Sequence, residues 1–173
     1  MLGRTDVPVE QQSAELWRAV AGDRGERLFG DFGHPLLAAA VGVAVEARTP
    51  IEALRRFDEA VRREGAAGLS LDMGRRALAR TVAAAGGGAG FGAELFAEAA
   101  GYYVSRDLPS YLGAAGRVAT ASEAMALKDR FRAVARGAAR SAGAAAGPTN
   151  DPQAWRVYVA RVVDALRTRR GSR

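Results

Sequence analysis

The sequence predicts an all-α protein, a compact bundle of six to eight helices that forms a single domain over residues 1–173. No segment alternates apolar and polar residues with a period of two, and no strand–turn–strand signal occurs. Apolar residues recur instead at steps of three and four, as on one face of a helix. Proline or capping-box residues mark helix starts at His34-Pro35, Thr49–Glu52, Thr120–Glu123 and Asp151-Pro152. We therefore expect more than half of the chain to be helical.

The first two expected helices differ in character. Residues 9–21 have a narrow apolar face, which consists of Leu16, Trp17 and Val20. Residues 35–47 begin with proline at the first helical position, where its missing N–H is not needed. This second helix is apolar nearly all round, which predicts a place at the centre of the fold or against a partner.

Three helices are expected in the middle of the chain. The first begins at the Thr49–Glu52 capping box, with Pro50 at the first helical position, runs to Glu64 and stops at Gly65. The next starts at Ser70 or Asp72 and runs to residue 85. The third spans residues 93–104 and follows a glycine-rich break at 86–92, which we interpret as a hinge between helices.

The last part of the chain is expected to hold a short helix from Ser110 and two long ones. The first long helix spans residues 120–142 and begins with the Thr120–Glu123 capping box. The final helix follows Asp151-Pro152 and runs to about Arg169. The remaining segments are a loose arm at 1–8, a linker at 141–150 and a basic tail at 170–173.

Composition excludes several kinds of function. Because the chain has no cysteine, it can form neither disulfides nor thiol-based sites. No run of 18 apolar residues occurs, and the N-terminus has no apolar stretch typical of a secretory signal. We expect a cytoplasmic protein without a membrane partner.

Catalytic and metal-binding motifs are weak. His34 is the single histidine, and its place before Pro35 favours a capping role. Glu94 and Glu98 lie four residues apart without a matching Glu-x-x-His helix, so we interpret them as a solvated face. The glycine-rich segment 86–92 lacks the Gly-Lys-Ser/Thr of a phosphate-binding loop. We therefore expect no enzyme activity, no cofactor and no metal.

The charge distribution is the strongest functional signal. The formal net charge is +6, but residues 128–173 carry 11 basic and 3 acidic residues, whereas the preceding 127 residues carry 14 basic and 16 acidic ones. Such asymmetry indicates an anionic partner, commonly nucleic acid. The cations gather in a stripe at four-residue spacing and in a cluster near the C-terminus. We predict that these are the nucleic-acid-binding residues: Lys128, Arg132, Arg136, Arg140, Arg167, Arg169 and Arg170.

The stripe is expected to face solvent, because its spacing keeps it on one side of the helix while Leu127, Phe131 and Val134 occupy another. Evenly spaced arginines suit a phosphate backbone and carry no sequence information. Two interpretations remain open besides backbone binding. The stripe could be an ordinary solvated helix face, and the protein could be a helical interaction or adaptor module without nucleic acid. The apolar helix at 35–47 and the aromatic residues Tyr102, Tyr103 and Tyr111 would then form the partner surface.

A small, basic, all-helical chain with the stripe Lys128, Arg132, Arg136 and Arg140 resembles the small helical subunits of CRISPR effector complexes. The resemblance covers size, fold class and charge over the whole chain. It implies a non-catalytic subunit of a ribonucleoprotein that lines a path for guide RNA or displaced DNA. The partners would be RNA or single-stranded DNA and other protein subunits or copies of itself.

Overall fold

The computed structural model describes residues 29–107, 120–145 and 149–168. The chain is all-α, and well over half of it is helical, as predicted. Within the described ranges there is no strand, and residues 29–31 are helical. Six further helices follow: α3 (Pro35–Glu46), α4 (Pro50–Glu64), α5 (Leu69–Ala83), α6 (Gly87–Asp107), α7 (Ala121–Ala145) and α8 (Pro152–Thr168). The helices predicted at 9–21 and from Ser110, the arm at 1–8 and the tail at 170–173 lie outside the described residues.

The predicted helix starts are confirmed by their hydrogen bonds. His34 Nδ1 accepts the backbone N–H of Leu36 at 3.1 Å, so the single histidine is a helix cap. In the second capping box, Thr120 Oγ1 accepts the N–H of Glu123 at 3.2 Å and Glu123 Oε2 accepts the N–H of Thr120 at 3.1 Å. Asp151 Oδ1 accepts the N–H of Ala154 at 2.7 Å. These polar side chains satisfy amides that have no partner inside their own helices.

The nearly uniformly apolar helix, α3, lies at the centre of the fold. It packs against α4, α5, α6 and α8 and buries six side chains: Leu36, Leu37, Ala38, Ala40, Val41 and Ala44. Its contact with α5 is close, since a Cβ atom added to Gly74 would overlap Cδ2 of Leu37. The composition of α3 is thus explained by a central position within this chain.

The glycine-rich segment 86–92 differs from the prediction. It is not a hinge before a helix at residue 93, because α6 already begins at Gly87. The turn is confined to residues 84–87, where Ala85 and Gly87, the first residue of α6, have φ values of 52° and 56°. Gly92 is needed for packing, because an added Cβ would lie 2.9 Å from Cε1 and Cζ of Tyr158. The sequence pattern showed the glycines but could not show the tyrosine from α8 that requires one of them.

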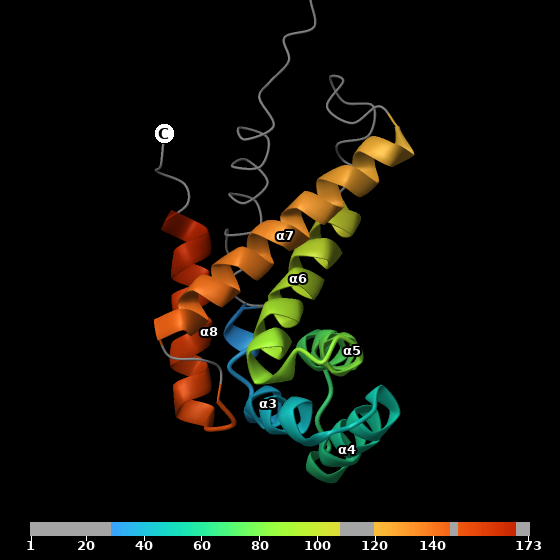
Figure 1. Cartoon of the computed structure of the whole chain (residues 1–173), viewed down its shortest axis with the longest axis vertical. Coiled ribbons are helices and arrows are strands. Elements are labelled where there is room, and N and C mark those ends of the chain that lie inside the picture. The colour runs from blue at the N-terminus through green and yellow to red at the C-terminus, as the bar shows by residue number, and fades with distance from the viewer. Residues whose placement is uncertain (1–28, 108–119, 146–148, 169–173) are drawn as a thin grey trace, which may run out of the picture.

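The longest helices, α6 and α7, form an extended pair with α8 on one side and α3 to α5 at one end (Figure 1). The α6–α7 contact is the most extensive between any two described helices. The pair is closely packed because many of the side chains buried on it are small: Ala93, Ala97, Ala99, Ala100, Ala135, Ala138 and Ala139. α7 continues to Ala145, so the start of the predicted linker at 141–150 is helical instead.

The C-terminal helix α8 closes the core with the apolar face that the sequence predicted. Trp155 and Tyr158 are buried, and their rings lie 5.3 Å apart. Trp155 Nε1 donates to the carbonyl of Phe32 at 2.6 Å, and Tyr158 Oη donates to the carbonyl of Ala139 at 3.3 Å. These bonds satisfy the polar ends of large buried rings. No helix in the described part of the chain is long and apolar enough to cross a membrane.

Candidate anion-binding site

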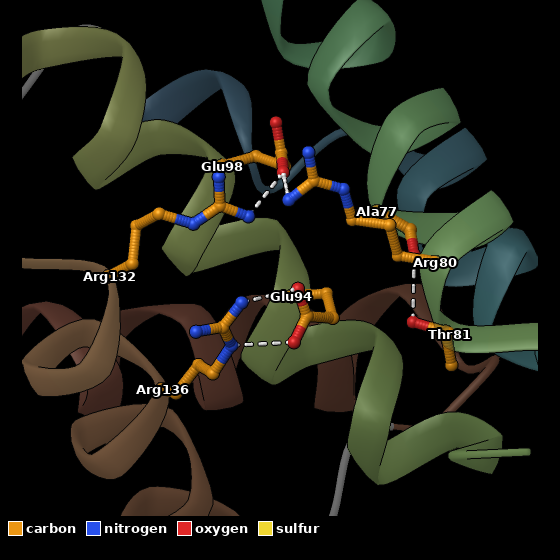
Figure 2. Close-up of polar contacts among 7 residues, drawn as sticks. All are labelled: Ala77, Arg80, Thr81, Glu94, Glu98, Arg132 and Arg136. Atoms are coloured by element: carbon orange, nitrogen blue, oxygen red, sulfur yellow. Dashed lines mark hydrogen bonds and ion pairs between the residues drawn. The ribbon is translucent and has the colours of Figure 1, made fainter. Parts of the chain in front are cut away.

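Two ion pairs join α6 to α7. Glu94 pairs with Arg136, and Glu98 pairs with Arg132 at 2.9 Å (Figure 2). The order of the partners is reversed along the two helices, which shows that the helices are antiparallel. Two carboxylates four residues apart therefore meet two arginines four residues apart, each set on a single helix face.

This arrangement corrects the prediction that the cationic stripe faces solvent. The side chains of Arg132 and Arg136 are only 13% and 30% exposed, because both point toward α6. Arg140 is exposed as predicted, and Lys128 is half-buried. Leu127 and Phe131 are buried as predicted, whereas Val134 is only partly buried.

The interpretation of Glu94 and Glu98 as a solvated face is wrong. Glu98 is 8% exposed, and the side chain of Glu94 is 17% exposed. Carboxylates are rarely buried unless they are paired, and here each lies against arginine. The hydrogen bonds that Arg136 donates to Glu94 raise the pKa of Arg136 above its ordinary value, so this arginine stays charged. A signal for these ion pairs was present in the sequence, since two glutamates and two arginines with the same four-residue spacing lie on α6 and α7.

A third helix contributes to the same cluster. Arg80 on α5 places Nη1 2.6 Å from Oε1 of Glu98, the same oxygen that Arg132 contacts (Figure 2). One carboxylate oxygen therefore lies between two guanidinium groups. The side chain of Arg80 is 49% exposed, so the cluster extends from the interior to the surface.

Arg80, Glu98 and Arg132 form part of the wall of a recess between α5, α6 and α7, with a volume of about 280 Å³. We call it the cationic recess. Its lining residues are Leu69, Asp72, Met73, Arg76, Arg80, Glu98, Gly101, Tyr102, Ser105, Lys128 and Arg132. Four of these side chains are cationic and two are acidic, so the recess carries an excess of two positive charges.

The side chains of two of the cations pass beside Gly101 at the wall of the recess. A Cβ atom added there would lie 3.4 Å from Cδ of Arg132 and 3.4 Å from Cε of Lys128. The aliphatic stems of both side chains therefore run across the glycine. Lys128 and Arg132, one turn apart on α7, are thereby brought beside Arg76 and Arg80, one turn apart on α5.

The structure thus brings together only part of the predicted binding set. Lys128 and Arg132 line the cationic recess, while Arg136 is held by Glu94 outside it. Arg167 lies on α8, 3.8 Å from Asp164, away from this recess. Arg169 and Arg170 lie outside the described residues. Sequence reasoning missed Arg76 and Arg80, because they sit on a helix whose charge pattern is unremarkable.

A larger hollow of about 600 Å³ lies between α8 and residues 29–35, and it has a different character. Apolar side chains make up much of its lining, including Phe29, Val159 and Val163. Its two arginines, Arg156 and Arg167, are matched by two aspartates in the same lining, so the hollow has no excess of positive charge. The cationic recess is therefore the better anion site.

Among the residues that the structure describes, no group of three or more histidine, aspartate or glutamate side chains could hold a metal ion. The chain matches no protein-family model, and comparison with curated proteins and with solved structures gives no match.

Proposed function

We propose that the protein is a non-catalytic helical subunit that binds the phosphate backbone of RNA or single-stranded DNA, with the cationic recess as its main contact, within a larger ribonucleoprotein assembly. One observation carries the proposal. Four cationic side chains from two helices surround one recess and outnumber its two carboxylates. An excess of positive charge in a hollow attracts anions more strongly than the same charge spread over an open surface.

The internal ion pairs prepare the recess for a second anion. A guanidinium has five N–H donors, and Glu98 engages one nitrogen each of Arg80 and Arg132. N–H donors of both guanidinium groups therefore remain for a phosphate oxygen, while Glu98 holds the two groups in place. Fixed guanidinium groups lose less conformational freedom on binding than mobile ones, and they bond phosphate strongly.

α7 also carries exposed cations outside the recess. Arg130 and Arg140 are exposed on α7, the helix that supplies Lys128 and Arg132. Backbone contacts of this kind position a strand without reading its sequence. His34, which would be the obvious general base, instead caps α3, and this fits a binding role without chemistry.

The test is direct. Purified protein should bind short fluorescent RNA and single-stranded DNA with little dependence on sequence, as measured by anisotropy. The logarithm of the affinity should fall linearly with the logarithm of salt concentration, by about 0.7 for each phosphate contacted. If neither nucleic acid binds at low salt, the proposal fails.

The alternative, a helical interaction module without nucleic acid, is favoured by one observation. Val45 and Ile51 are 67% and 81% exposed, and they lie at the end of α3 and the start of α4. Two exposed aliphatic side chains at the α3–α4 junction provide a surface that a protein partner can cover. Tyr103, which was expected to contribute to such a surface, is buried, and Tyr111 lies outside the described residues.

A further inference from the structure

Tyr102 gives the cationic recess a feature that phosphate binding alone does not use. It lines the recess together with the four cations and is 38% exposed, whereas its neighbour Tyr103 is buried. The two rings meet edge to face with centroids 5.9 Å apart, which restrains the orientation of Tyr102. An aromatic ring therefore stands in the wall of a positively charged hollow.

The size of the recess limits what can enter. Its volume of about 280 Å³ is close to the lower end for small-molecule sites, about 300 Å³. This is room for one nucleotide unit and not for a base pair with both its strands. In a duplex the bases are stacked and paired, so a single base can reach a pocket only when the strand is single or the base is extruded.

We infer that the cationic recess binds one nucleotide unit of a single strand, with the base stacked on Tyr102 and the adjoining phosphate held by Arg76, Arg80, Lys128 and Arg132. The inference rests on the proposed function and makes it more specific. Proteins that bind single strands without sequence preference combine a cationic groove with aromatic rings, because every base has a face that can stack. Tyr102 is thus the residue that selects a single strand over a duplex or a plain polyanion.

The experiment compares two probes of equal charge on the full chain. One is a short fluorescent oligodeoxyadenylate, and the other is the same length of abasic deoxyribose phosphate. The wild-type protein should bind the adenylate between about 5-fold and about 150-fold more tightly, the range for stacking one base on an aromatic side chain.

The variants are a matched pair. Tyr102→Leu removes the ring and keeps an apolar side chain with high helix propensity, whereas Tyr102→Phe keeps the ring. We expect Tyr102→Leu to bind both probes equally, at the wild-type affinity for the abasic probe, and Tyr102→Phe to retain the preference. Circular dichroism of each variant checks that it is folded. If Tyr102→Leu does not fold, the test uses the wild-type and Tyr102→Phe proteins. Both should bind the single-stranded adenylate more tightly than its duplex form.

The outcomes separate this inference from the proposed function. Equal binding of both probes by the wild-type protein overturns the stacking role and leaves backbone binding intact. Binding of neither probe overturns both. Binding of adenosine 5′-monophosphate without binding of the oligonucleotide would show a site for free nucleotides and would overturn the inference that the recess binds a single strand.

Discussion

Glu94 on α6 holds Arg136 on α7 at two points, with Nε 2.6 Å from Oε1 and Nη2 3.0 Å from Oε2. Together with Glu98 and Arg132, this pair fixes which faces of α6 and α7 meet. Because the helix–helix contact is otherwise rich in alanine, the ion pairs are the polar contacts that distinguish these faces from the others.

Arg136→Gln should therefore destabilise the protein. It leaves the mostly buried carboxylate of Glu94 without its ion-pair partner, which we expect to cost about 1–2 kcal/mol, less than for a fully buried pair. Each kcal/mol lowers the midpoint of thermal unfolding by about 2–4 °C in a chain of this size. The double variant Glu94→Gln/Arg136→Gln should recover part of the loss. The exposed Arg140→Gln is the control, and an equal loss there would contradict the structural role of the pair.

Gly92→Ala should also destabilise the protein, by about 1–3 kcal/mol, because the new methyl group overlaps Tyr158. The tyrosine cannot move aside, since it is 2% exposed and packs against Trp155 and Phe96. Gly42→Ala is the matched change, because its Cβ would meet Asn150 at an ordinary 3.6 Å and alanine favours the helix. Urea unfolding of the two variants should give changes in stability of opposite sign, and similar changes would contradict the packing argument.

The sequence predicted local features, such as helix caps, correctly, but it did not predict contacts between distant residues. Caps and turns depend on residues a few positions apart, so His34, Thr120 and Asp151 could be assigned correctly. Gly92 depends on Tyr158, which is distant in the sequence, and its local surroundings resemble a loop. Sequence spacing predicted that Arg132 and Arg136 share a face. It did not show which face was covered, because that depends on how α7 packs on α6.

The stability of the protein should fall in alkaline solution because of Tyr158. Burial raises the pKa of its hydroxyl well above the ordinary value of 10.0. Above about pH 10 the unfolded chain loses this proton while the folded chain keeps it, so the free energy of unfolding decreases by up to about 1.4 kcal/mol per pH unit. Tyr158→Phe should lose less stability than the parent between neutral and alkaline pH, as measured by urea unfolding at each pH. An identical pH dependence would contradict the contribution of this hydroxyl.

The last prediction separates anion binding by the cationic recess from a general effect of net charge. Asp72 and Arg76 lie one turn apart on α5, and both line the recess. Arg76→Gln should weaken binding of single-stranded RNA and reduce the salt slope by about 0.7, whereas Asp72→Asn should strengthen binding.

Glu59 and Arg63 provide the control. They have the same spacing on α4, are exposed and do not line the recess, so Glu59→Gln and Arg63→Gln change the net charge equally. Long-range effects of net charge are screened beyond about 8 Å at physiological salt, so the α4 variants should bind like the parent there. If the α4 and α5 variants shift the affinity to the same extent, the recess has no special role and backbone binding must be assigned to another surface.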